Sequence, residues 1–467
     1  MMRRTTPGDA TSRGPSSRPT SSRRGKQGDG VTTTSTIDWN AWTEQATEWL
    51  SEFIRIDTVN PPGNESRACD WLGRILDAEG IPYQTYDPGN GRPSLVARLQ
   101  GDGSRGKALI LLSHTDVVPF EREEWTVEPL GGEVRDGYVW GRGALDMKGQ
   151  GIMELITFLI HHRQRLPLTR DLVLMAVADE EAGSTYGVEF LDREHPEILD
   201  CEYVINEGGG GSTEALGVER TTMNIGVSEK GPMWLTLHAH GRPGHGSVPH
   251  DDNAADHLVR ALHRVLSWQR PHVVTPEIQE YFDQLHAAGI LDRAPTKSVL
   301  AEIAEDNARL KSLQTNSISL TTLTAGVKHN VIPAHAQATI DCRLVPGYDA
   351  ERFIEELTAV IDDPRITIER VFVASTPTTS HHTELYDVMV RETKRIVEDA
   401  LVLPSVSTGF TDSRVFRRRG VAAYGFVPTI TGPSEQGRVH GNDERISIEN
   451  LRTGTQIMHA VVRGICG

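Results

Sequence analysis

The sequence predicts an α/β protein whose largely parallel sheet is covered by helices and interrupted by a smaller α+β unit. Between residues 39 and 219, strand-like runs such as "KALILLSHTDVVP" alternate with amphipathic runs such as "KGQGIMELITFLIHHRQR". Such alternation is typical of a parallel sheet with helices on both faces. After Glu219 the pattern changes, because "GPMWLTLHAHG" alternates with period two, as a strand with one covered face does. A chain of 467 residues is also too long for one compact core.

In the first half of the chain, helical spacing predicts two helices, and the second of them ends at Gly80 as a helix should. Strands and helices then alternate up to a strand that runs into four glycines. In chain order, the segments are the helices "WTEQATEWLSEFIRI" and "SRACDWLGRILDAEG", the strands "SLVARLQ" and "KALILLSHTDVVP", the helix "KGQGIMELITFLIHHRQR", the strand "DLVLMAVADEE", the helix "YGVEFLDREH" and the strand "CEYVINEGGGG".

The unit that follows is predicted to hold four strands and to be inserted in the first domain. Its segments are "GPMWLTLHAHG", the helix "NAADHLVRALHRVLSW", an irregular helical region to about Ser312, the strands "SISLTTLTAG" and "ATIDCRLVPG", the helix "AERFIEELTAVI" and the strand "ITIERVFVAS". The α/β pattern then resumes with "LYDVMVRETKRIVEDA", "AAYGFVP" and "SIENLRTGTQIMHAVVRGI". We expect a disordered tail at 1–36, a main domain at 37–222 and 373–467, and the insertion at 223–372.

Composition excludes several classes of protein. The net charge of −16 argues against a general nucleic-acid binder. No apolar run approaches the roughly 20 residues of a membrane span, so no membrane contact is expected. The four cysteines are scattered without a CxxC pair, which fits a reducing, cytoplasmic environment and excludes a thiolate metal site.

Polar residues gather where the predicted strands end, which is where open α/β sheets place their sites. His114 and Asp116 share one face at positions i and i+2, although this pattern alone also suits a structural hydrogen-bonded pair. Asp146 precedes a helix, where an N-cap is the ordinary explanation. The other residues in such positions are Glu180 and Glu181, Glu207 before the glycines, and His440 in a loop before the last helix.

The adjacent glutamates are expected to have different functions. On a strand, neighbouring side chains point to opposite sides, so Glu180 and Glu181 should not face the same partner. Asp146, Glu181 and Glu207 would meet at one edge of the sheet with three negative charges, and unpaired they would destabilise the fold. Two divalent cations and a hydroxide would balance them. With two neutral imidazoles, the nitrogen and oxygen ligand set suits Zn²⁺ and tolerates Co²⁺ or Mn²⁺.

Eight motifs together resemble the dizinc aminoacylase/carboxypeptidase G family, which includes acetylornithine deacetylase, succinyl-diaminopimelate desuccinylase and carboxypeptidase S. They are "SHTDVVP", "GRGALDMKG", "ADEEAG", "NEGGG", "GRPGHGS", "KHNVIPAHAQATIDCR", "GFTDSR" and "HGNDER". The resemblance covers the chain from about Asp38 to Gly467. It implies a zinc-exopeptidase-like catalytic domain and a ferredoxin-like insertion that serves as a lid and dimerisation unit.

The resemblance also implies the role of each metal-site residue. Asp146 would bridge two zinc ions, and the peptide bond after it would be cis. His114 and Glu207 would complete one metal site, while Glu181 and His440 would complete the other. Asp116 would orient His114, and Glu180 would be the general base. Asp179 is expected to support the loop.

Further residues would contact the substrate. The resemblance implies that His245 of the insertion, often contributed by the second subunit of a homodimer, stabilises the oxyanion, although a surface histidine in a Gly-rich turn would look similar. Asn330 and Arg343 would bind the substrate, and Arg414 is a second candidate for its carboxylate. Structural roles for Arg343 and Arg414 are the alternatives.

The expected function is hydrolysis of the amide bond of an N-acyl-amino acid or short peptide that bears a free carboxylate. A deacylase, a dipeptidase and a carboxypeptidase remain open within this class. The alternative from another class is an inactive family member that acts as a binding protein, which the intact metal and base positions disfavour.

Overall fold

The computed structural model describes residues 36–435 and 437–467. The expected disordered tail therefore lies outside the described residues, except for Thr36. Residues Asp38–Gly467 form one compact unit. No helix in the described part of the chain is long and apolar enough to cross a membrane.

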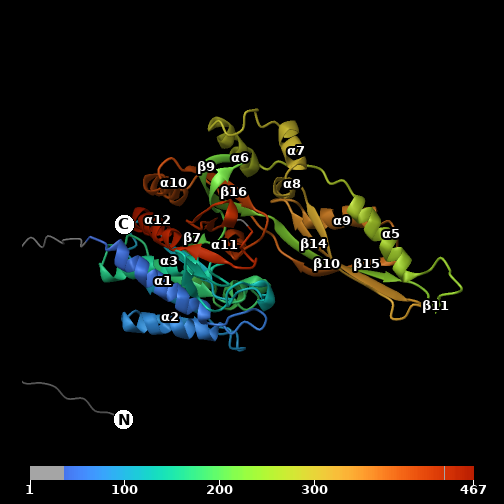
Figure 1. Cartoon of the computed structure of the whole chain (residues 1–467), viewed down its shortest axis with the longest axis horizontal. Coiled ribbons are helices and arrows are strands. Elements are labelled where there is room, and N and C mark those ends of the chain that lie inside the picture. The colour runs from blue at the N-terminus through green and yellow to red at the C-terminus, as the bar shows by residue number, and fades with distance from the viewer. Residues whose placement is uncertain (1–35, 436) are drawn as a thin grey trace, which may run out of the picture. The chain divides into compact units, whose positions relative to one another are not determined.

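A ten-stranded mixed sheet forms the centre of the main domain, which confirms the predicted α/β fold (Figure 1). The strand order is β1-β2-β6-β3-β7-β17-β9-β8-β18, and β16 pairs with β9. Its central strands β6, β3, β7 and β17 run parallel. The strands are β1 (Tyr83–Tyr86), β2 (Ser94–Leu99), β3 (Ala108–His114), β6 (Leu172–Val177), β7 (Cys201–Asn206), β8 (Gly210–Ala215), β9 (Val218–Glu229), β16 (Leu401–Ser407), β17 (Ala422–Gly425) and β18 (Ile430–Thr431).

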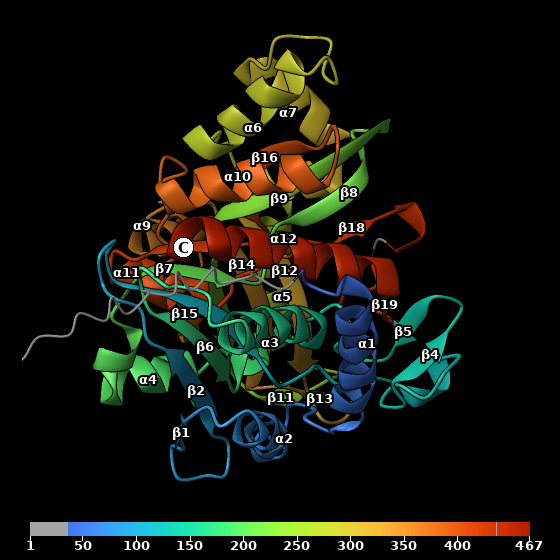
Figure 2. The same ribbon diagram turned by 90° about the vertical axis from the view of Figure 1, so that its left-hand side faces the viewer.

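Helices pack against this sheet: Figure 2 shows α3 and α12 in front of the strands, and residues of α4 and α11 share a buried cluster with β3 and β6. The central strands β3 and β6 are buried along their whole length, so their side chains are apolar almost throughout. The helices of this domain are α1 (Trp39–Arg55), α2 (Ser66–Ala78), α3 (Lys148–Arg163), α4 (Val188–Glu194), α10 (Glu384–Ile396), α11 (Ser413–Arg418) and α12 (Ile448–Cys466).

A small three-stranded sheet joins two distant segments that flank the site. It consists of β4 (Glu133–Arg135), β5 (Tyr138–Trp140) and β19 (Arg445–Ser447), in the order β19-β5-β4. The pairing of β5 with β19 brings the loop before α3 next to the loop that carries His440.

The insertion contains the predicted four-stranded sheet, in the order β12-β14-β10-β15. The strands are β10 (Gly231–His240), β12 (Ser317–Ala325), β14 (His335–Leu344) and β15 (Ile366–Val373), and a separate pair is formed by β11 (Gly244–His245) and β13 (Val331–Ile332). Helices α5 (Ala254–Ser267) and α9 (Ala350–Ile361) cover one face, where Leu235, Leu258 and Phe353 belong to one buried cluster. Trp234 and the alternate residues that follow it on β10 point to the opposite face.

The structure differs from the expected insertion in two respects. Its sheet begins at Gly231 rather than near residue 223, because β9 continues in the ten-stranded sheet as far as Glu229. The irregular helical region forms α6 (Pro276–Ala287), α7 (Lys297–Glu305) and α8 (Ala308–Gln314). Their apolar faces pack with Leu403 and Val406 of β16, so this segment covers part of the ten-stranded sheet.

Candidate dinuclear metal site

Five side chains form two clusters that share Asp146. One cluster is His114, Asp146 and Glu207, and the other is Asp146, Glu181 and His440; within each, one ligand atom per residue lies within 4.8 Å of the others. Asp146 directs Oδ1 to His114 Nε2 at 3.1 Å and Oδ2 to His440 Nε2 at 3.0 Å. The two oxygens of one carboxylate therefore face two different imidazoles.

The ends of neighbouring strands position the first cluster. His114 is the last residue of β3, and Glu207 directly follows β7, which pairs in parallel with β3. His114 Nε2 lies 3.8 Å from Glu207 Oε1. Gly209 approaches the backbone of Asn224 so closely that a Cβ would lie 2.1 Å from the Asn224 oxygen. This contact requires glycine where the chain turns after Glu207.

Asp146 lies at the start of α3, in a loop that Glu444 fixes from behind. The Glu444 carboxylate accepts hydrogen bonds from the backbone N–H groups of Gly143, Leu145 and Asp146, at 3.1, 2.7 and 3.0 Å. It also pairs with Arg142 at 2.6 Å. The Asp146–Met147 peptide bond is cis, as expected.

Arg142 links this loop to the loop of the second cluster. Its Nη2 donates to the backbone oxygen of His440 at 3.2 Å, while Nη1 holds Glu444. Sequence reasoning missed Arg142 and Glu444, although both fall inside quoted motifs. Their partnership joins residues 302 positions apart, and nothing in the local pattern indicates it.

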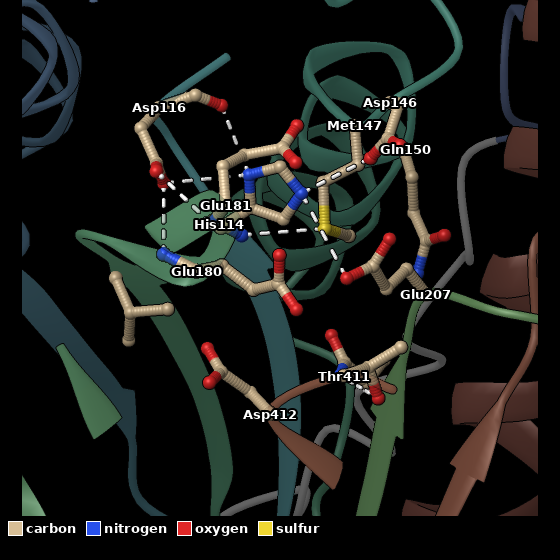
Figure 3. Close-up of polar contacts among 12 residues, drawn as sticks. His114, Asp116, Asp146, Met147, Gln150, Glu180, Glu181, Glu207, Thr411 and Asp412 are labelled. Carbon is tan, nitrogen blue, oxygen red and sulfur yellow. Dashed lines mark hydrogen bonds and ion pairs between the residues drawn. The ribbon is translucent and has the colours of Figure 1, made fainter. Parts of the chain in front are cut away.

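Glu180 and Glu181 do not lie on a strand, so the alternation argument for their different directions was wrong. Strand β6 ends at Val177, and Glu180–Ala182 form a short 3-10 turn that follows Asp179 in left-handed conformation. Their different directions come from this turn. Glu181 Oε2 lies 3.2 Å from His440 Nε2, whereas Figure 3 shows the Glu180 carboxylate facing Glu207 and Asp412.

Asp116 supports both the turn and His114. Its carboxylate accepts the backbone N–H groups of Glu180 and Glu181, each at 3.2 Å. His114 Nδ1 lies 3.0 Å from the Asp116 backbone oxygen and 3.5 Å from its Oδ1 (Figure 3). A hydrogen bond from Nδ1 to either oxygen leaves Nε2 to face Asp146 and Glu207.

A buried cation holds Asp179. Arg92 Nη1 lies 2.9 Å from Asp179 Oδ1, and the same guanidinium donates from Nε to Glu65 at 2.9 Å. Asn60 donates to both Asp116 and Asp179, at 2.8 and 3.1 Å. The first acid of "DEE" is thus neutralised by arginine and supports the loop, as expected.

The site carboxylates disfavour one another's charge. Burial, followed by repulsion from Asp146, raises the pKa of Glu207 to about 8. Burial and then Glu207 raise the pKa of Glu180 well above its usual range. Hydrogen bonds from His114 and His440 outweigh burial and hold the pKa of Asp146 below its usual range.

These residues fit divalent metal ions. Every donor is an imidazole nitrogen or a carboxylate oxygen, a set that suits zinc. Glu181 Oε1 is buried without a hydrogen-bond partner among the described residues, which is costly unless a cation or ligand engages it. Cations in both clusters would offset the repulsion that raises the pKa of Glu207.

The end of β9, where the chain enters the insertion, contacts the same region. Glu229, the last residue of β9, accepts the backbone N–H and the hydroxyl of Thr411 at 3.1 and 2.6 Å. Asn206, the residue before Glu207, donates to the Thr411 hydroxyl at 3.3 Å. Arg417 lies 3.0 Å from Glu229 and completes this buried network.

The family model of peptidase family M20/M25/M40 matches residues 110–464. The chain belongs to this family. It is 29% identical to the N-fatty-acyl-amino acid synthase/hydrolase PM20D1 of Xenopus tropicalis, over 87% of this chain and 83% of that protein. It is also 29% identical to aminoacylase-1 of Sus scrofa, over 85% of this chain and 89% of the relative.

Solved structures share the fold. The M20 metallo-carboxypeptidase of Sulfolobus solfataricus superimposes with a TM-score of 0.70 at 17% identity, over 90% of this chain and 99% of its own. A Bacillus subtilis M20 protein, described as a dinuclear metal binding peptidase, gives 0.57 at 12% identity, over 91% and 98%. Family membership makes the chain a metal-dependent amidohydrolase of the exopeptidase type.

The structure does not bring every candidate residue to the metal cluster. His245 pairs with Val331 at the β11–β13 sheet, and the Asn330 oxygen accepts the N–H of Gly246 at 2.9 Å. Both residues are exposed. His245 comes after the end of β10, whose ten residues span about 30 Å, and the β11–β13 pairing places Asn330 at the same end.

The two candidate arginines differ in exposure. Arg414 is completely buried, and its guanidinium donates to the oxygens of Gly183 and Thr411 and lies 3.1 Å from Glu189. Arg343 is partly exposed and pairs with Asp341 through Nε and Nη2, at 2.8 and 3.0 Å. The guanidinium of Arg414 therefore supports the Gly183 loop, while Arg343 still presents an edge to solvent.

Proposed function

We propose that the protein is a dizinc hydrolase that cleaves the amide bond of N-acyl-amino acids or short peptides with a free carboxylate. The observation that carries this proposal is the division of the Asp146 carboxylate between two imidazoles. His114 and Glu207 would hold one zinc ion, and Glu181 and His440 the other. Co²⁺ or Mn²⁺ would be accepted by the same ligands.

Glu180 is the general base of this proposal. Its carboxylate forms no hydrogen bond with another described residue, and burial keeps its pKa high, so it is suited to exchange a proton. Bound zinc would polarise the scissile carbonyl and acidify the attacking water. Glu180 takes the proton of that water and delivers it to the leaving amine. Asp116 fixes the turn that aims Glu180.

The substrate carboxylate is assigned to Arg343. The Nη1 of this residue has no hydrogen-bond partner among the described residues, while Asp341 holds the other edge of the guanidinium. Arg414 is less suited to bind the substrate carboxylate, because it is buried and its nitrogens face other groups of the protein.

A homodimer formed through the insertion would supply the remaining groups. Strand β12 is an edge strand with most residues exposed, and such an edge is ready to pair with another strand. In this dimer His245 and Asn330 of one subunit would reach the metals of the other, where His245 stabilises the oxyanion. A cytoplasmic location accords with the scattered cysteines.

The test measures metal content and the hydrolysis of N-acetyl-amino acids and dipeptides by the full chain. We expect two metal ions per chain and turnover of at least one substrate class. Glu180→Gln should keep both metals while kcat falls by about 10³ or more. The matched control is Glu194→Gln, an exposed acid of α4 that should leave kcat unchanged.

Two outcomes would contradict this proposal. A chain that binds metals but hydrolyses nothing would support the alternative of an inactive binding protein. Full activity in the Glu180→Gln variant would remove Glu180 as the base. Cleavage of dipeptides alone would assign the enzyme to the dipeptidase or carboxypeptidase type rather than to the deacylases.

A further inference from the structure

Three aromatic rings meet where the open face of the inserted sheet approaches the catalytic domain. Trp234 lies on β10, Phe372 is its register partner on β15, and Phe410 lies in the loop after β16. The ring centroids are 5.0 Å apart for Trp234 and Phe372, 5.7 Å for Phe372 and Phe410, and 6.2 Å for Trp234 and Phe410. All three residues are only half-buried, so part of this aromatic cluster is accessible.

The aromatic cluster borders the loop that carries Glu180. Gly183 directly follows the Glu180–Ala182 turn, and a Cβ on it would lie 3.8 Å from the Phe372 ring. Phe410 precedes Thr411 and Asp412, and Figure 3 shows the Asp412 carboxylate neighbouring that of Glu180. The rings therefore border the two loops that carry Glu180 and Asp412.

The cluster also borders the candidate carboxylate anchor. The Arg343 guanidinium lies over the Phe410 ring, 5.2 Å from its centroid. Asp341 occupies Nε and Nη2, which leaves the Nη1 edge for a ligand. The buried Arg414 guanidinium also lies over this ring, 5.3 Å from its centroid, so Phe410 contacts two cations.

Two chemical groups are thus available side by side, a cationic edge and an apolar aromatic surface. A carboxylate bound at Arg343 would bring the adjoining Cα close to the rings. The side chain on that Cα belongs to the amino acid released by hydrolysis. Aromatic rings favour other rings in tilted or edge-on contacts, and a small side chain would leave this surface exposed to water.

We propose that the aromatic cluster selects substrates whose leaving amino acid carries a large apolar side chain, preferably an aromatic one. This inference rests on the proposed function, because it concerns the substrate of the same site. Trp234, Phe372 and Phe410 act as specificity-determining residues, and Arg343 sets the position of the amino acid against them.

The experiment compares kcat/KM for N-acetylphenylalanine and N-acetylalanine, using the metal-loaded full chain. We expect the wild-type enzyme to prefer N-acetylphenylalanine at least tenfold. Phe410→Ala and Trp234→Ala should each lower this preference by about tenfold, mainly through KM for the aromatic substrate. The matched control is Trp268→Ala, which removes a partly buried indole from the covered face of the same insertion and should leave the preference unchanged.

Conservative variants distinguish a loss of substrate preference from a loss of folding. Phe410→Leu and W234F keep an apolar side chain and should retain part of the preference, with circular dichroism as the folding control. Equal losses of activity on both substrates would show that the rings only pack the insertion against the loop, which overturns the inference. Activity without a preference for the aromatic substrate in the wild-type enzyme overturns it as well. No hydrolysis of any substrate would instead contradict the proposed function, and the inference would fall with it.

Discussion

The metal cluster and the β11–β13 tip of the insertion differ in how their residues are held. Behind Asp146, the Glu444 carboxylate accepts three backbone N–H groups, and the buried Arg142 fixes it. His245, in contrast, is exposed, and within the described part of the chain its Nδ1 contacts only Ser247 of the same turn, with the hydroxyl at 2.7 Å. The candidate metal ligands are therefore ordered by contacts within one chain, whereas the imidazole of His245 is held only by its own turn among the described residues.

The largest expected effect comes from Asp146→Ala, because this change removes a ligand from both clusters at once. We expect both metal ions to be lost and activity to fall by about 10⁴ or more. Metal analysis after dialysis, together with kcat/KM, measures the effect. Retention of one tightly bound ion would show that the clusters are independent rather than joined by Asp146.

His245→Ala should impair the function of the insertion tip without disturbing the metal cluster. We expect kcat to fall by about 10² to 10³, as for loss of an oxyanion donor, with the metal content unchanged. Co-expression with the Glu180→Gln chain should restore activity to roughly a quarter of wild type, because mixed dimers contain one intact site. No restoration by the second chain would place the action of His245 within its own subunit.

Glu444→Gln should weaken the metal cluster without removing a ligand. The amide nitrogen of glutamine would face the N–H groups that now donate to the carboxylate, so the loop of Asp146 loses part of its support. We expect metal affinity to fall by about 10- to 100-fold, measured with a competing chelator. Glu435→Gln, which breaks the nearby pair with Arg445, is the matched control and should change affinity little.

The smallest effect concerns stability and pH at Glu154 of α3. Burial raises the pKa of this fully buried carboxyl to about 8, and its Oε1 accepts a hydrogen bond from Gln150 at 2.9 Å. The folded state thus keeps a proton that the unfolded chain releases near pH 4.5. Stability should fall as pH rises from about 4.5 to 8.

Glu154→Gln removes this dependence, because an amide does not titrate. We expect the variant to gain on the order of 2–4 kcal/mol relative to wild type at pH 8, and less at pH 5. Denaturant unfolding at both pH values measures the difference. An equal effect at the two pH values would show that the carboxyl is ionised throughout.

Much of the fold was predictable, because long buried strands and amphipathic helices carry strong periodic signals. His114 and Glu207 were found by the rule that parallel strands place polar residues at their ends. The turn at Glu180 was not predictable in this way, because Asp179 adopts a left-handed conformation that ends the strand pattern. Family resemblance, rather than alternation, gave the two glutamates their roles.

The residues that support the ligands were missed for a different reason. Arg92, Glu65 and Asn60 contact Asp179 or Asp116 across large distances in the sequence. Their local patterns are ordinary surface sequence, and only the folded chain shows that they are buried. Long-range polar contacts leave no periodic trace, so a single sequence does not reveal them.

The Glu229–Thr411–Asn206 network connects the strand that enters the insertion with the candidate metal cluster. Glu229 ends the strand that leads into the insertion, and Asn206 precedes the ligand Glu207. If a rotation of the insertion altered these hydrogen bonds, it would change the affinity for a metal bound beside Glu207. By reciprocity, that metal must then bias the insertion toward one orientation by the same free energy. Metal occupancy of the cluster and the orientation of the insertion would then be coupled, so a change in one would shift the other.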